Sequence, residues 1–167
     1  MGATYISSDL HLGHKNIAKY REYISSTEEN TRLIVDEWRS RIHKRDIVYL
    51  LGDIAFDKDH LYLLESLPGR KILIRGNHDN HMQTKALTQV FAEIEGLMSK
   101  WHFWLSHAPI HPQELRGKCN IHGHVHNATI PDDRYLNVCC DNLYTNYGSS
   151  FIKLEKVREI FASRTQN

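Results

Sequence analysis

Histidines and aspartates recur in this sequence at spacings that would let their side chains bind metal ions together. The stretch IHGHVH, residues 121–126, carries three histidines at every second position around one glycine. If this stretch is a strand, the three imidazoles point to one face, because side chains alternate between the two faces of a strand. Histidine is the commonest metal ligand in proteins, so the spacing indicates a metal site. The alternative is a polar, histidine-rich loop that binds no ion.

Four other stretches supply similar side chains, namely DLH at 9–11, GD at 52–53, GNHD at 76–79 and a histidine at 107. The candidate metal ligands are Asp9, His11, Asp53, Asn77, His107, His124 and His126. They offer oxygen and imidazole nitrogen but no sulfur, which disfavours a closed structural zinc site and favours Mn²⁺, Fe or Zn²⁺ over a pure Mg²⁺ site. Seven ligands exceed the needs of one tetrahedral ion and suit two ions that share a carboxylate. Two ions roughly 3.5–4 Å apart can clamp the attacking and leaving oxygens of a phosphoryl group.

Each of these stretches follows a short apolar run that is typical of a strand. The predicted strands are residues 3–8, 46–51, 71–75, 101–106 and 118–122. Helical spacing of apolar residues predicts helices that begin near Thr27 as N-cap, around 61–67, at 83–91 and at 154–162. Strands that alternate with helices indicate βαβ units, whose ligands bind beyond the carboxyl ends of the strands. The candidate ligands are therefore expected at one edge of a largely parallel sheet, and residues 137–141 (NVCCD) are expected to return to it as a further strand.

Composition describes an ordinary globular protein of 167 residues, with 41% apolar and 25% charged residues. The formal net charge of +1 gives no overall attraction to nucleic acid or to an anionic membrane. Cys119, Cys139 and Cys140 form no spaced metal motif, and the adjacent pair is expected to fill the core without a disulfide. No leader pattern or membrane-spanning apolar run is present, so the expectation is a cytoplasmic protein.

The ordered motifs DLH, GD, GNHD, H and GHVH, from Asp9 to His126, resemble those of the calcineurin-like metallophosphoesterase family. The resemblance implies an α/β fold, a four-layer α/β/β/α sandwich of two mixed sheets flanked by helices. It implies one domain over residues 1–167 without a cap domain. Two divalent transition-metal ions are expected, manganese first, with iron, zinc or nickel as alternatives.

Carried over residue by residue, the resemblance also implies roles for the motif side chains. One metal would be held by Asp9, His11 and His126, the other by Asn77, His107 and His124, and Asp53 would bridge the two. A hydroxide between the metals would attack the phosphorus. His78 would donate a proton to the leaving oxygen or stabilise charge on the phosphoryl group, with the Asp79 carboxylate orienting its ring.

Four other histidines lie near the motifs without a settled role. His122 is expected to end its strand or to support the site, and Gly123 to leave room where a Cβ would clash. His14 could contact the substrate phosphate or act as a surface or capping residue. His81 and His111 are loop histidines near motif residues.

The expected activity is hydrolysis of a small phosphoester, a nucleotide being one candidate, with a phosphodiester preferred over a monoester. A catalytically inactive scaffold that binds proteins is the alternative from another class, but all seven ligands, His78 and Asp79 are present. A nuclease finds little support, because the charge is balanced and no aromatic and basic stripe is evident. Nothing in residues 128–151 specifies the substrate, and nothing in the sequence fixes the oligomeric state.

Overall fold

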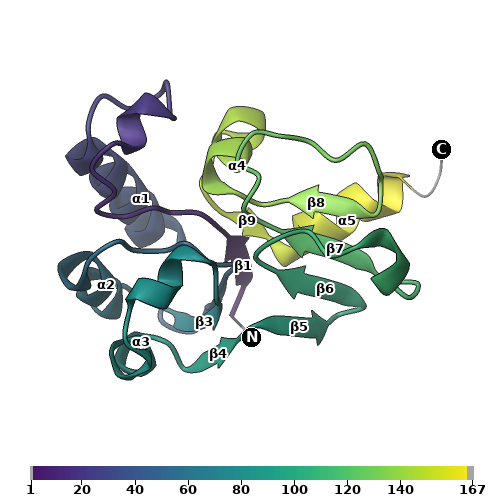
Figure 1. Ribbon diagram of the computed structural model, residues 1–167, viewed down its shortest axis with the longest axis horizontal. Helices are drawn as coiled ribbons and strands as arrows, with labels where there is room; N and C mark the ends of the chain where they lie inside the picture. Colours follow the sequence, from purple (N-terminus) through teal and green to yellow (C-terminus); the bar gives the residue numbers. More distant parts are fainter. Residues whose placement is uncertain (1, 165–167) are drawn as a thin grey trace.

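The computed structural model of the protein describes residues 2–164, and its strands form two mixed β-sheets (Figure 1). The first sheet consists of β1 (Thr4–Ser7), β2 (Ile47–Leu50), β3 (Arg70–Ile74), β4 (Glu93–Glu95) and β9 (Ile152–Lys153), in the order β4-β3-β2-β1-β9. The second consists of β5 (Leu97–Lys100), β6 (Phe103–Ser106), β7 (Cys119–His122) and β8 (Tyr135–Asn137), in the order β5-β6-β7-β8. In each sheet one edge strand, β9 or β5, is antiparallel to its neighbour and the other pairings are parallel.

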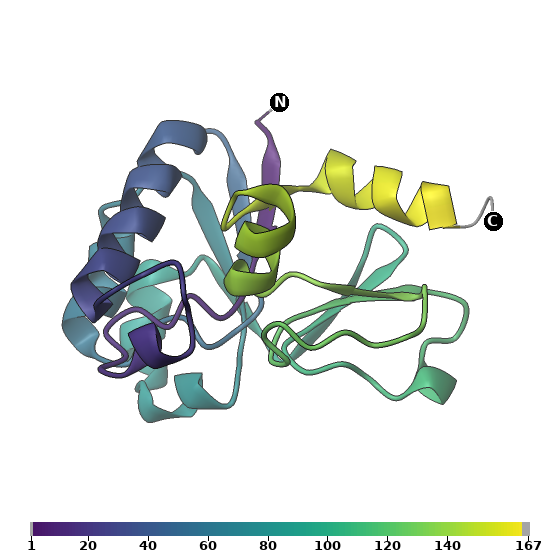
Figure 2. The same ribbon diagram turned by 90° about the horizontal axis from the view of Figure 1, so that it is seen from above.

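Five α-helices flank the two sheets within the described residues. They are α1 (Thr27–Arg41), α2 (Lys58–Glu65), α3 (Thr84–Val90), α4 (Cys140–Tyr147) and α5 (Leu154–Arg164). Three 3-10 turns occur at η1 (Ile17–Lys19), η2 (His78–His81) and η3 (Pro112–Glu114). In Figure 2 the blue and teal helices α1, α2 and α3 lie along one face of the first sheet, and the green second sheet lies beyond its other face. This arrangement confirms the predicted α/β sandwich of two mixed sheets.

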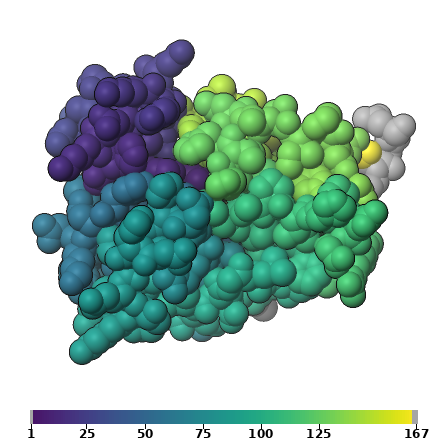
Figure 3. All heavy atoms as spheres, in the orientation of Figure 1, coloured from purple at the N-terminus to yellow at the C-terminus, as the bar shows by residue number. Residues whose placement is uncertain are grey.

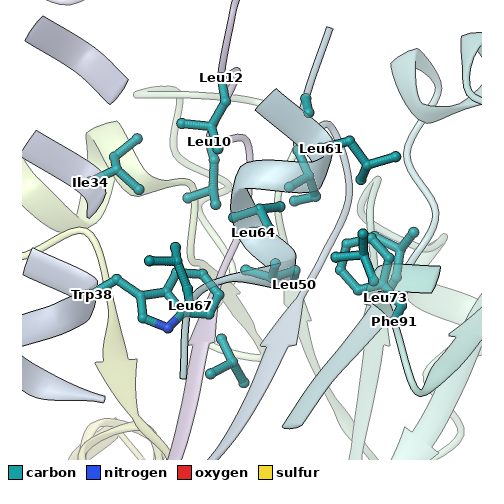
Figure 4. Close-up of a cluster of buried hydrophobic side chains, with 14 of the residues drawn as sticks. Leu10, Leu12, Ile34, Trp38, Leu50, Leu61, Leu64, Leu67, Leu73 and Phe91 are labelled. Atoms are coloured by element: carbon teal, nitrogen blue, oxygen red, sulfur yellow. The ribbon is translucent and has the colours of Figure 1, made fainter. Parts of the chain in front are cut away.

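The first sheet buries apolar side chains on both faces, because alternate residues of each strand point in opposite directions. Ile6 is paired in register with Tyr49, and both belong to the core that the two sheets share with α4 and α5. The opposite face packs against the first three helices, where Trp38 is fully buried and its indole nitrogen donates to the carbonyl of Pro68 at 2.8 Å. Figure 4 shows Trp38 beside Leu67 and Leu64 in this cluster. The strands are therefore held from both sides, which fixes the positions of their ends.

The first helix begins one residue earlier than its predicted cap. Ser26, not Thr27, is the N-cap, and its hydroxyl accepts a hydrogen bond from the amide of Glu29 at 3.1 Å. Ser26 and Glu29 have the spacing of a capping box, in which a glutamate stands three residues after the cap. The prediction of Thr27 as the N-cap was therefore wrong by one residue.

The stretch 137–141 does not form the predicted strand. The strand β8 ends at Asn137, and helix α4 begins at Cys140, so that Asp141 lies in the first turn of a helix. The apolar residues of this stretch are buried, as they would be in a strand. Val138 packs in the core between the sheets, together with Leu143 of α4. Residues 138–140 are apolar because they are buried where β8 leads into α4, and this short apolar run resembles a strand in the sequence.

Candidate metal centre and active site

The candidate ligands lie directly beyond the carboxyl ends of five strands, in agreement with the sequence. Asp9 follows β1, Asp53 follows β2, Asn77 follows β3, His107 follows β6 and His124 follows β7. The ends of the two sheets meet here, because the amide of His124 donates to Oδ2 of Asp9 at 2.9 Å. The imidazole Nδ1 of His107 likewise lies 2.8 Å from the carbonyl oxygen of Leu51. Residues from both sheets therefore share one site.

Five of the seven candidate ligands have a left-handed backbone conformation. They are Asp9 (φ 55°), His11 (φ 50°), Asp53 (φ 56°), His124 (φ 72°) and His126 (φ 51°). Few residues other than glycine adopt positive φ, although aspartate and histidine do so more readily than most. Residues held in such sparsely populated conformations cluster at functional sites. The backbone turns sharply at these positions and directs the side chains toward a common centre.

Two glycines allow the close approach of the strand ends. A Cβ at position 123 would lie 2.0 Å from Oγ of Ser8 and 2.4 Å from Oδ2 of Asp9. A Cβ at position 76 would lie 2.2 Å from Oδ1 of Asp53. Any side chain at either glycine would displace a candidate ligand, so the structure confirms the prediction that Gly123 leaves room for its neighbours.

Asp9, His11 and His126 form the first group of potential ligand atoms, all within 4.8 Å of one another. Nε2 of His11 lies 3.6 Å from Oδ1 of Asp9, which is beyond hydrogen-bonding distance. Both ring nitrogens of His11 and Oδ1 of Asp9 are buried without a hydrogen-bond partner in the described chain. Buried polar atoms in proteins are nearly always paired, so these atoms have the character of metal ligands.

Asp53, His107 and His124 form the second such group. Nε2 of His107 lies 3.4 Å from Oδ2 of Asp53 and 2.9 Å from Oδ1 of Asn77. It also lies 3.1 Å from Nδ1 of His124. Four atoms that carry lone pairs therefore converge, and a bound cation would satisfy all of them at once.

The electrostatics of both groups favour positive charge. Burial acts to raise the pKa of Asp9, but His11 and His107 outweigh it and hold the pKa below its usual range. Burial acts to lower the pKa of His107, but the carboxylates of Asp53 and Asp9 raise it above its ordinary value. Ionised carboxylates thus draw positive charge to the site, and a divalent ion would supply it. The donor set of oxygen and nitrogen without sulfur fits divalent transition metals.

The sequence analysis missed Asp141, which supports the first group. Its Oδ2 lies 2.8 Å from Nδ1 of His126, and its side chain is 1% exposed. This carboxylate raises the pKa of His126 by hydrogen bonding to the ring. A carboxylate behind a ligating histidine fixes the ring orientation and the nitrogen that carries the lone pair, which leaves Nε2 to face the centre. The misassigned strand at 137–141 concealed this residue.

Arg21 is a second residue that the sequence did not reveal. Its guanidinium is buried, donates to the backbone carbonyls of Asp9 and Leu10 and to Oδ1 of Asn30, and lies 3.8 Å from Asp141. It therefore holds the main chain of the first motif in place and balances the charge of Asp141. A buried arginine in a polar segment has no periodicity that would distinguish it from a surface residue.

His78 lies at the edge of the two groups, with its side chain 42% exposed and Nε2 at 3.9 Å from Oδ2 of Asp53. Its own amide donates to Oδ1 of Asp53 at 2.8 Å, which ties this turn to the second group. The ring is therefore accessible to solvent beside the two groups and belongs to neither of them.

Asp79 does not orient the ring of His78, which corrects the expectation from the sequence. Its carboxylate is buried and accepts three backbone hydrogen bonds, from Asp53 at 2.9 Å, from Ile54 at 3.0 Å and from Gly76 at 2.8 Å. Burial raises the pKa of Asp79 although the three amides act in the opposite direction. Asp79 thus joins the ends of β2 and β3 and fixes the main chain of Asp53.

The other motif-proximal histidines occupy different surroundings. His122 is the last residue of β7, is buried and pairs Nδ1 with the carbonyl of Gly123 at 2.9 Å. His14 packs edge-on against Phe56 at 4.6 Å between ring centroids, close to the first group. His111 accepts a hydrogen bond at the start of η3, and His81 lies at the exposed end of η2. The prediction that His122 ends its strand is confirmed.

The two adjacent cysteines also contact the first group. The thiol of Cys139 lies 3.1 Å from Oδ2 of Asp9, and that of Cys140 lies 3.1 Å from the carbonyl oxygen of Asp9. All three cysteines of the chain are free, and burial raises the pKa of both Cys139 and Cys140. The pair therefore remains as protonated thiols that pack behind Asp9, although it spans a helix start and not a strand.

Two mixed sheets with paired groups of histidine and aspartate at their strand ends define the class of metallo-dependent phosphatase-like proteins. Residues 4–165 match the calcineurin-like phosphoesterase superfamily domain, and the chain belongs to this family. It is 33% identical to an uncharacterized protein of Methanocaldococcus jannaschii over an alignment 143 positions long, gaps included, which covers 82% of this chain and 77% of that protein. It is 31% identical to the gene 66 protein of Mycobacterium phage L5 over an alignment 166 positions long, gaps included, which covers 78% of this chain and 80% of that protein.

A solved structure shares the fold. The protein of unknown function AQ665 from Aquifex aeolicus superposes with a TM-score of 0.73 at 24% identity, covering 96% of this chain and all of that one. Within residues 2–164, no helix is both long enough and apolar enough to cross a membrane. Family membership and the two ligand groups together support metal-dependent hydrolysis of phosphoesters.

Proposed function

We propose that the protein is a phosphodiesterase that uses two divalent metal ions. The observation that carries the proposal is the pair of adjacent ligand groups, in which Asp9 and His11 keep buried lone pairs without partners. Asp9, His11 and His126 would hold one ion. Asn77, His107 and His124 would hold the other, with Asp53 shared between them. When bound, two such ions activate water for attack and neutralise charge on the phosphoryl oxygens.

The residues of the chain have separate tasks in this proposal. Asp79 and Arg21 hold the main chain of the ligands, and Asp141 orients the ring of His126. His78 donates a proton to the leaving oxygen, because its ring is exposed beside Asp53 and belongs to neither ligand group. General acids of this kind typically contribute roughly 10²–10⁴-fold to the rate.

The exposure of the site supports a diester substrate. His124 is exposed, and the side chains of His126 and His78 are 41% and 42% exposed. A phosphodiester carries a substituent on each side of the phosphorus, so it needs an open site. We infer that manganese is the preferred ion, since the ligands are mixed imidazole and carboxylate.

A screen of Mn²⁺, Ni²⁺, Zn²⁺ and Mg²⁺ against 4-nitrophenyl phosphate and bis(4-nitrophenyl) phosphate tests the proposal. We expect release of nitrophenolate from the diester to be faster than from the monoester, and fastest with Mn²⁺. The His124→Ala variant should lose this activity, whereas His102→Ala, which changes an exposed histidine outside both groups, should keep it. Faster hydrolysis of the monoester would make the protein a monoesterase. Absence of hydrolysis with every metal would contradict an enzymatic role and favour a binding scaffold.

A further inference from the structure

A cavity of about 760 Å³ lies between the segment that leads into α1 and helix α4. Its lining includes Tyr20, Tyr23, Asn127, Asn142, Tyr144 and Asn146. In Figure 3 the purple residues of the N-terminal segment meet the light-green residues that follow β7 on the face shown. The volume falls within the range of small-molecule binding sites.

This cavity adjoins the first ligand group from two directions. Asn127, at one wall, directly follows His126 in the chain. Tyr20, at another, lies 6.2 Å from the ring of His14, which in turn lies 5.7 Å from the ring of His11. A substituent on a phosphorus bound at the metals could therefore extend into the cavity.

A continuous aromatic edge connects the proposed proton donor to the cavity. The ring of His78 lies 5.1 Å from that of Phe56, and Phe56 lies 4.6 Å from His14. The contact of His14 with Tyr20 completes the series at the cavity mouth. These centroid separations are those of aromatic rings in contact. A planar ring system attached to the substrate would find aromatic surface along this path.

The cavity itself offers stacking surface and amides, and the one acidic side chain of its lining is the exposed Glu22. Tyr23 and Tyr144 are stacked at 4.2 Å with an interplanar angle of 21°, and Tyr20 is 66% exposed. The only cation among the lining residues is Arg21, whose guanidinium is already bound by the backbone of the first motif. A second phosphate would therefore find no free positive charge here.

Hydrogen-bonding groups stand beside these rings. The side chain of Asn127 is exposed, makes no hydrogen bond within residues 2–164, and can both donate and accept. A neutral planar ring with donors and acceptors on its edge could stack on the tyrosine rings and form hydrogen bonds with Asn127. We propose that this cavity binds the nucleobase of a nucleotide phosphodiester whose phosphorus is held at the two ligand groups. The inference rests on the proposed function, since it assigns the substituent of that substrate.

The activity arm of the test compares two diesters that share one leaving group. Thymidine 5′-(4-nitrophenyl phosphate) carries a base, and methyl 4-nitrophenyl phosphate does not. We expect the wild-type kcat/KM to favour the thymidine ester on the order of tenfold, as for stacking of one base. Tyr20→Ala should remove most of this preference, and Asn127→Ala should reduce it. Tyr62→Ala, which changes another exposed tyrosine outside the cavity, should leave it unchanged.

The binding arm needs no activity. In two-dimensional NMR spectra of the full chain, thymidine should shift the amide signals of Tyr20 and Asn127, whereas 2-deoxyribose should not. Thymidine should bind Tyr20→Ala about tenfold more weakly. If neither ester is hydrolysed, the proposed function fails, and the shifts alone decide whether the base site exists. If the methyl ester is hydrolysed but thymidine causes no shifts and no preference, the base site is refuted and the phosphodiesterase stands.

Discussion

The carboxylate of Asp141 lies 2.8 Å from Nδ1 of His126, and both this carboxylate and the guanidinium of Arg21 behind it are buried. The pairing occupies Nδ1, so Nε2 is the ring nitrogen of His126 that remains for the group formed with Asp9 and His11. An exposed histidine would otherwise turn freely about its side-chain bonds. Asp141 thus determines which nitrogen reaches the first ligand group and in what direction.

Replacing Asp141 by Asn should weaken metal binding at the first group. Loss of a carboxylate behind a ligating histidine typically lowers metal affinity roughly 10- to 100-fold. Calorimetric titration with Mn²⁺ should show one weakened site and one of unchanged affinity. Asp36→Asn, at an exposed position of α1, is the matched control. Equal weakening of both sites, or of neither, would contradict the assigned role.

The same pair should make the stability of the metal-free protein depend on pH. Asp141 raises the pKa of His126 above the ordinary value of 6.5, so this contribution is fully present below pH 6.5 and is lost as the pH rises through the folded pKa. Burial acts to raise the pKa of Asp141, but His126 and Arg21 outweigh it and lower the pKa below 3.8. The contribution of Asp141 to stability is therefore lost as the pH falls through the pKa of this carboxyl in the folded protein. The difference in Tm between wild type and Asp141→Asn, with chelator present, should be greatest between about pH 4 and pH 6.5. A difference that grows toward pH 9 would show that the pair is not charged as described.

Replacing Asp79 by Asn should destabilise the fold and disturb the second ligand group. The amide cannot accept all three backbone hydrogen bonds from Asp53, Ile54 and Gly76, so a buried N–H is left facing another donor. Such a loss costs about 1–3 kcal/mol of unfolding free energy. Urea unfolding with an unchanged m-value would measure it, and metal content should fall as the main chain of Asp53 shifts. A variant with full stability and metal content but slow turnover would instead support a direct role in catalysis.

Replacing His78 by Ala should leave metal content unchanged and slow turnover according to the leaving group. For an alkoxide-like leaving group the loss should fall within roughly 10²–10⁴-fold, and for nitrophenolate it should be smaller, because less protonation is needed. His81→Ala changes a neighbouring exposed histidine and is the control. A penalty that does not vary with leaving-group basicity would indicate that His78 binds phosphate without donating a proton. Loss of a metal would make it a ligand.

The sequence predicted that the candidate ligands gather at the strand ends because their surroundings are local. Each of Asp9, Asp53 and His107 follows directly after a short apolar strand, and parallel strands bring such ends together. The core pattern of the strands and the order of the motifs therefore sufficed for the fold class and for the location of the site.

The supporting residues could not be predicted because their partners are distant in sequence or are backbone groups. Arg21 and Asp141 are far apart in the sequence and come into contact only through the tertiary fold. The partners of Asp79 are backbone amides, which a sequence motif does not contain. The left-handed conformations of Asp9 and His11 are likewise imposed by the packing of the strand ends. A single sequence reveals side-chain chemistry more readily than the contacts that orient it.

The number of metal ions bound per chain tests the central claim most directly. Elemental analysis of the protein after reconstitution with Mn²⁺ and removal of excess metal should give two equivalents, because two groups of ligand atoms lie side by side. Asp53→Asn should lower the content of both sites, since the proposed bridge loses its charge. A fully active protein with one equivalent, or one that stays active after metal is removed, would contradict the two-metal account.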